Sequence, residues 1–171
     1  MKGALFAITV VTAASTCLAA EPYTFTIPGK GWALKMVLPP LAAYQAEDAE
    51  AGFRFVGSCG KDVGVTVSIF VESSEVTDSG ECRTELWAQG SKNAMIREET
   101  VRLVELGGKP AVTYTIEGEF QGQHVKAQNA NVYIAHAGTC VDVHVSRFPF
   151  TEAAEAELAL IASSVAVESQ K

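Results

Sequence analysis

The sequence of 171 residues has little that would support membrane insertion or nucleic-acid binding. After its first residues it contains no apolar run long enough to cross a membrane, which takes about 20 residues. Only 13 lysines and arginines stand against 20 aspartates and glutamates, which gives a net charge of −7. Nucleic acid and anionic lipid bind basic surfaces. We therefore expect no nucleic-acid partner and no membrane span.

Motifs that bind phosphates, nucleotides or catalytic zinc are also missing. The chain has no phosphate-binding loop, no dinucleotide-binding glycine fingerprint and no HExxH motif. No two of its cysteines have the CxxC spacing that structural zinc prefers. Ser146 is not framed by the glycines of a nucleophile elbow. The sequence thus predicts no cofactor, no metal site and no catalytic residue, and we expect that the protein is not an enzyme.

The N-terminus has the layout of a secretory signal peptide. It reads MKGALFAITVVTAASTCLAAEP, with the basic Lys2, a short apolar core over Ala4–Val11 and small residues before Glu21. Lipidation of Cys17 is an alternative, but Ala14 and Thr16 do not match the usual pattern of a lipoprotein signal. We predict a signal peptide at residues 1–20, one domain at residues 21–171, and a periplasmic or extracellular location.

Alternating apolar and polar residues dominate the rest of the chain, and this period of two predicts β-strands. The acidic segments Gln45–Gly52 and Glu72–Glu81 are predicted to be loops. Strands are expected at Tyr23–Ile27, Trp32–Leu38, Phe53–Ser58, Val63–Glu72, Ile96–Leu106, Ala111–Gly118, His124–Ala135 and Cys140–Phe148.

Two segments, Asp78–Ala94 and Phe150–Glu168, have helical spacing instead. Asp78 and Thr151 are suitable N-caps for them. The second segment carries one apolar stripe, Ala154, Leu158, Ile161 and Val165. Strands joined by tight turns predict an antiparallel sheet of about six to eight strands, flanked by two or more helices, which is an α+β fold.

This order of elements resembles the PsbP-like α/β/α sandwich. The resemblance is carried by FTIPGKGWALKMVLP near the predicted mature start, by VGVTVSIFVE, and by CVDVHVSRFPFTEAAEAELALIASSVAVE at the C-terminus. These stretches match in element order and hydrophobic rhythm, and they contain no site motif. The resemblance implies a non-enzymatic binding or assembly role, by analogy of fold alone.

Three cysteines, Cys59, Cys82 and Cys140, follow the predicted signal peptide. In an exported protein they are expected to form one disulfide and leave one thiol over. Following the expected strands from end to end of the sheet places Cys82 and Cys140 at one end and Cys59 at the other. The pair Cys82–Cys140 is therefore favoured, while the absence of a bridge and the other two pairings stay open.

The segment Asn129–Val145 gathers several polar side chains that chemistry could use. With a two-residue turn at Ala137–Gly138, Tyr133 faces Asp142 and Asn131 faces His144, all on one face of a hairpin. Cross-strand polar pairs on a solvated or helix-edged sheet face are the simplest interpretation. A surface for a ligand or partner formed by Asn131, Tyr133, Asp142 and His144 is the alternative.

The predicted function is that of an exported, non-catalytic binding or accessory protein, with a protein partner or a small ligand. One alternative is a small hydrolase or metal-dependent enzyme that uses the face of Asp142 and His144. A second alternative is an inhibitor or immunity-type protein that binds a secreted toxin. The sequence selects neither the ligand nor the partner.

Overall fold

The computed structural model describes residues 20–49, 52–59 and 64–170. The predicted signal peptide lies outside these residues except for Ala20. In the described part of the chain, no helix has the length and hydrophobicity needed to cross a membrane.

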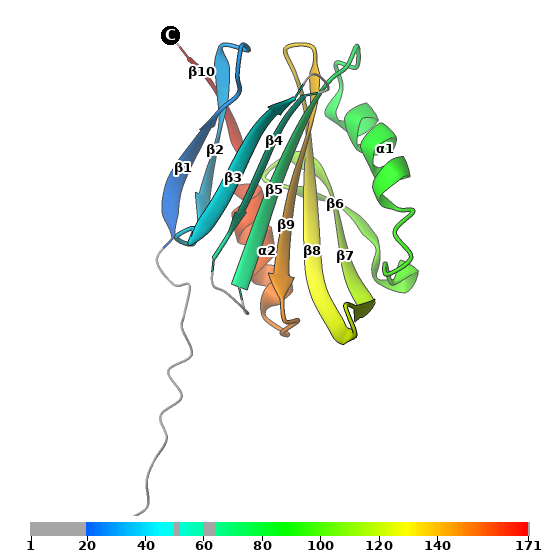
Figure 1. Cartoon of the computed structure of the whole chain (residues 1–171). Coiled ribbons are helices and arrows are strands. Elements are labelled where there is room, and N and C mark those ends of the chain that lie inside the picture. The colour runs from blue at the N-terminus through cyan, green and yellow to red at the C-terminus, as the bar shows by residue number, and fades with distance from the viewer. Residues whose placement is uncertain (1–19, 50–51, 60–63, 171) are drawn as a thin grey trace, which may run out of the picture.

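A seven-stranded antiparallel sheet is the centre of the fold (Figure 1). Its strand order is β3-β4-β5-β9-β8-β7-β6. The prediction of an antiparallel α+β fold with six to eight strands and two helices is confirmed. The strands are β3 (Ala43–Ala49), β4 (Gly52–Ser58), β5 (Gly64–Ser73), β6 (Arg102–Leu106), β7 (Lys109–Phe120), β8 (Gln123–His136) and β9 (Thr139–Phe148).

The first two strands and the last one form a separate three-stranded sheet, in the order β1-β2-β10. Its strands are β1 (Glu21–Thr26), β2 (Trp32–Leu38) and β10 (Ala166–Ser169). The inward side chains of β2 (Trp32, Leu34, Met36 and Leu38) are buried. They form one core cluster with Val132 and Val143 of the large sheet.

The two helices, α1 (Ser79–Gly90) and α2 (Ala154–Ser163), cover opposite faces of the large sheet. Helix α2 shares its face with the small sheet, where Leu158 and Ile161 are buried in the core between the sheets. Helix α1 packs over β7, β8 and β9, where Cys82 belongs to a second cluster with Tyr114 and Tyr133 (Figure 1). The layers are therefore helix, sheet, and helix with small sheet.

The N-terminus of α1 is set by Asp78, as the sequence predicts. The Asp78 side chain accepts hydrogen bonds from the backbone N–H groups of Gly80 at 2.8 Å and Glu81 at 3.1 Å. A disulfide between Cys82 and Cys140, with Cα atoms 5.6 Å apart, joins the first turn of α1 to the start of β9. The favoured pairing is thus confirmed. The expectation of a leftover thiol is wrong for the described residues, because none of their cysteines is free.

The C-terminal segment differs from the single long helix that the sequence predicts. Helix α2 begins after Ala153, which makes no side-chain cap, so the predicted Thr151 cap is wrong. The helix ends where Ser164 Oγ donates to the Ile161 carbonyl at 2.6 Å and accepts from the Val37 N–H at 2.9 Å. This link to β2 redirects the chain, and residues 166–169 continue as β10 along β2.

Two further segments also differ from expectation. The predicted loop Gln45–Gly52 contains most of β3, which pairs with β4 along its whole length. β3 is an edge strand, and edge strands tolerate charged residues that hide an alternating pattern. The predicted strand Ile96–Leu106 is divided by a short 3-10 helix at Glu98–Thr100, so that only Arg102–Leu106 forms β6.

Candidate functional site

The β8–β9 hairpin has the register that the sequence predicts. Ala137 and Gly138 form the turn, with φ angles of 47° and 74°, which suit a tight two-residue hairpin turn. Tyr133 pairs with Asp142 and Asn131 pairs with His144. The predicted site residues therefore lie together on one face, the face that α1 covers in part.

Each of the two ionisable side chains on this face contacts an asparagine. Asn131 Nδ2 donates to both carboxylate oxygens of Asp142, at 2.8 and 3.0 Å. His144 Nε2 lies 3.0 Å from Asn129 Oδ1. Because Asn129 Nδ2 already donates to the Ala127 carbonyl at 3.1 Å, Oδ1 is the acceptor and His144 Nε2 carries the proton. We call Asn129, Asn131, Tyr133, Asp142 and His144 the α1-side cluster.

Part of this cluster is deeply buried. Tyr133 is fully inaccessible, and its hydroxyl has no hydrogen-bond partner among the described residues. The same holds for Asn131 Oδ1. The Tyr114 ring stacks on His144, with ring centroids 6.5 Å apart, and contacts Trp87 of α1 at 5.0 Å. The face is therefore closed by aromatic rings at α1 and is half-buried at Asp142 and His144.

Burial shifts the titration of this cluster in opposite directions. It raises the pKa of Asp142 to about 7, helped by the nearby Glu72 carboxylate and opposed by the hydrogen bond from Asn131. It lowers the pKa of His144 to about 4. Burial and the charge of Asp142 raise the pKa values of Tyr114 and Tyr133 as well. At neutral pH the imidazole is uncharged, and Asp142 exchanges its proton in this range.

The α1-side cluster has the properties of a structural polar network. Asp142 and His144 are each held by an asparagine, and no hydrogen bond joins the two. Across residues 20–49, 52–59 and 64–170, no three histidine, cysteine, aspartate or glutamate side chains are grouped to hold a metal ion. A binding role for Asn131, Tyr133, Asp142 and His144 stays a prediction.

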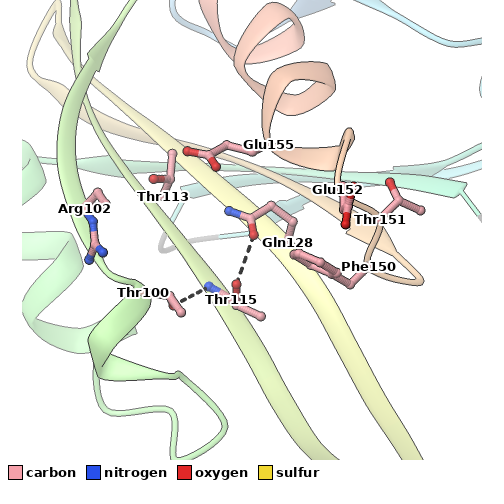
Figure 2. Close-up of a pocket in the computed structure, with 9 residues that line it drawn as sticks. All are labelled: Thr100, Arg102, Thr113, Thr115, Gln128, Phe150, Thr151, Glu152 and Glu155. Carbon is pink, nitrogen blue, oxygen red and sulfur yellow. Dashed lines mark hydrogen bonds between the residues drawn. The ribbon is translucent and has the colours of Figure 1, made fainter.

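A second candidate site lies on the opposite face of the sheet, where sequence reasoning placed none. It is a cavity of about 240 Å³ beside the middle of β7 and β8 (Figure 2). The end of the 3-10 helix, the first residue of β6, the segment before α2 and the first turn of α2 border it. We call it the Gln128 cavity; its lining residues are Thr100, Arg102, Thr113, Thr115, Gln128, Phe150, Thr151, Glu152 and Glu155.

The sheet side of the Gln128 cavity is polar and buried. Gln128 and Thr113 are each 7% exposed, and Thr115 is 5% exposed. Thr115 Oγ1 donates to Gln128 Oε1 at 3.0 Å, which orients the amide so that Nε2 is left as a donor (Figure 2). Thr100 Oγ1 accepts from the Thr115 N–H at 2.9 Å and fixes the neighbouring segment to β7.

The rim of the Gln128 cavity carries charge. Glu152 and Glu155 are exposed, and among the described residues neither forms an ion pair. Arg102 lies across the cavity from Glu152 in Figure 2, and its Nη1 donates to the carbonyls of Glu99 at 2.7 Å and Val101 at 2.8 Å. The Phe150 N–H donates to the Lys126 carbonyl at 2.9 Å, which anchors the rim to β8.

The sequence does contain a signal for this cavity. Thr113 and Thr115 of β7 and Gln128 of β8 occupy positions whose parity points to the apolar face, the face of Ala111 and Val132. Three buried polar residues in a row of otherwise apolar positions mark either an internal hydrogen bond or a ligand site. The lining residues before α2 gave no such signal, because their approach depends on tertiary packing.

Comparison with solved structures shows a similarity of fold. The sequence matches no family model and no curated protein. The structure is similar to that of LpqN, described as involved in cell envelope biogenesis of Mycobacterium tuberculosis, with a TM-score of 0.51 and 12% identity over 87% of this chain and 90% of that chain. A protein from Bacteroides thetaiotaomicron has a TM-score of 0.45 and 18% identity over 81% of this chain and 45% of that one. The predicted resemblance to PsbP-like proteins stays a prediction.

Proposed function

We propose that this chain is an exported, non-catalytic binding protein that holds a small polar ligand in the Gln128 cavity. The observation that carries the proposal is the Gln128 side chain, which is 7% exposed, is held at its Oε1 by Thr115 and lines the cavity beside Thr113. A polar side chain that is already fixed in place loses little conformational freedom when a ligand forms a hydrogen bond with it, and this favours binding.

Two observations support the exported location. The Cys82–Cys140 disulfide is a bond of oxidising compartments, and cytosolic proteins rarely keep one. The structurally similar LpqN is described as a protein of cell envelope biogenesis. Together with the signal-like N-terminus, these support a place in the cell envelope or outside the cell.

The volume limits the ligand. The Gln128 cavity has a volume of about 240 Å³. Pockets for drug-sized molecules usually begin at about 300 Å³. The expected ligand is therefore the size of a single sugar or a similar small metabolite, or one such unit at the end of a longer molecule.

The proposal is tested by titrating the ¹⁵N-labelled protein with three sugars of one size and different charge: glucose, glucosamine and glucuronate. At least one is expected to shift the Gln128 side-chain amide resonances in a saturable way. Thr113→Val, which removes a hydroxyl from the cavity and keeps the volume, should weaken that binding at least fivefold.

Thr66→Val is the matched control, because Thr66 is exposed on the other face of β5. It should leave the titration unchanged. If none of the three sugars produces saturable shifts at Gln128, or if both valine variants behave alike, the Gln128 cavity is not the ligand site that we propose.

A further inference from the structure

Resting on the proposed function, we infer that the Gln128 cavity selects a hydroxylated amine, such as an amino sugar or an amino alcohol. In this arrangement the ligand's ammonium group lies between Glu152 and Glu155 at the rim. Its hydroxyl groups face Gln128, Thr113 and Thr115 on the buried side.

The first step is the charge of the rim. The lining residues include two carboxylates, Glu152 and Glu155, and one guanidinium, that of Arg102. Figure 2 shows the Glu155 carboxylate directed toward the side of the cavity formed by Thr113 and Gln128. The lining set therefore has an excess of one negative charge close to the ligand space, and this favours a cation.

The second step is that neighbouring charges are already paired. Arg147 contacts Glu157 at 3.1 Å, and Lys126 contacts Glu117 at 3.5 Å. Lys126 also lies over the Phe150 ring at 5.0 Å. Apart from Arg102, which lines the cavity, the neighbouring cations Arg147 and Lys126 are thus paired with acids outside it. They leave Glu152 and Glu155 without an ion pair among the described residues.

Stabilisation of α2 by its dipole accounts only in part for the presence of the Glu155 carboxylate. Glu155 and Glu157 both lie in the first turn of α2, where the helix dipole favours negative charge. Glu157 has a cation partner in Arg147, whereas Glu155 faces the cavity. Glu152 precedes the helix and contributes a second carboxylate to the same rim.

The third step is that Arg102 is a single cation among lining residues that include two carboxylates. Its Nη1 is used by the backbone carbonyls of Glu99 and Val101, which fixes the guanidinium beside the 3-10 helix. An anionic ligand that reached Arg102 would lie in the same small space as the carboxylates of Glu152 and Glu155. Repulsion of this kind is how a site rejects the wrong charge.

The buried side of the cavity determines which groups the ligand carries besides its ammonium group. Gln128 is more than nine-tenths buried, and its Nε2 presents a neutral donor to the cavity. Thr113 adds a hydroxyl group that can accept or donate, and Thr115, whose hydroxyl hydrogen is donated to Gln128, adds an acceptor. A second charge placed here would be desolvated with no opposite charge to meet it, which is costly. Neutral hydroxyl groups satisfy these partners.

The test compares the same three sugars, which share a ring and differ in charge. Isothermal titration of the full chain should give binding of glucosamine at least tenfold tighter than that of glucose, with glucuronate the weakest. The Glu152→Gln/Glu155→Gln double variant should lose this tenfold preference of glucosamine over glucose. Glu85→Gln, an exposed glutamate of α1 on the other sheet face, removes one charge elsewhere and should keep the preference.

A second measurement does not depend on variants. Raising the pH until the glucosamine amine is neutral should weaken its binding to the level of glucose, whose own affinity stays constant. If glucose or glucuronate binds as tightly as glucosamine, the inference is overturned and the cavity remains a ligand site. If all three sugars fail to bind, the proposed function fails together with it.

Discussion

At the scale of single residues, Asp142 and His144 have opposite effects on stability. The folded protein holds the Asp142 proton up to a pKa of about 7, well above the ordinary 3.8, so this group's contribution falls as pH rises from about 4 to 7. The pKa of His144 is about 4 in the folded protein and 6.5 when exposed, so its contribution falls as pH drops from 6.5 toward 4. Between pH 4 and 6.5 the two effects oppose each other.

Single substitutions should separate these effects. For Asp142→Asn, the free energy of unfolding should rise between pH 4 and 6.5, because only the His144 effect remains. For His144→Gln, it should fall between pH 4 and 7. Since one pKa unit corresponds to about 1.4 kcal/mol, each change should be on the order of 3–4 kcal/mol. Urea denaturation at half-unit pH steps measures both curves.

The double variant provides the control. In the double variant, the free energy of unfolding should show neither the rise seen for Asp142→Asn nor the fall seen for His144→Gln. Parallel curves for the two single variants would contradict the opposite shifts.

At the scale of elements, some helices and strands are determined by local sequence and others by tertiary contacts. Asp78 begins α1 through hydrogen bonds to residues two and three positions later, and so it was predictable from sequence. The faces of β8 and β9 follow from alternation alone, and the Cys82–Cys140 pair follows from tracing strand directions. Elements whose formation depends on distant partners were not predictable.

Residues 166–169 illustrate that limit. Their apolar spacing continues the pattern of α2, yet the Ser164–Val37 contact and pairing with β2 make them a strand. β3 was hidden by its acidic residues, which an edge strand accommodates. The Gln128 cavity needs the approach of the segment before α2 to β7 and β8, and that approach has no signature in the local sequence.

The cap of α1 gives a prediction at this scale. Asp78→Ala removes the acceptor of two backbone hydrogen bonds and should lower the free energy of unfolding by about 1 kcal/mol. Asp78→Asn keeps a side-chain oxygen at the same position and should retain most of the stability. Thermal denaturation followed by circular dichroism measures both. Equal losses in the two variants would show that charge, and not the cap, is what matters.

At the scale of the whole molecule, α2 joins the two sheets. Leu158 is 1% exposed in the core shared by β2, β8 and β9, whereas Leu160, two residues later, is 75% exposed. The same helix therefore carries a leucine that holds the layers together and one that does not.

Alanine substitution at these two leucines tests the layered arrangement. Leu158→Ala should cost about 2–5 kcal/mol, because it leaves a cavity between the sheets. Leu160→Ala should change the stability by no more than about 0.5 kcal/mol. Urea midpoints with unchanged slopes provide the measurement. A comparable loss at both positions would contradict the packing of α2 against both sheets.

The alternation of β8 has a consequence for how this chain can change over time. Gln128 serves the cavity on one side, and Asn129 and Asn131 serve the cluster on the other. Inserting or deleting one residue upstream in this strand would exchange the sides on which these amides project. A single such change would disrupt both the cavity and the cluster. Insertions and deletions should therefore be tolerated only in the turns at the two ends of β8.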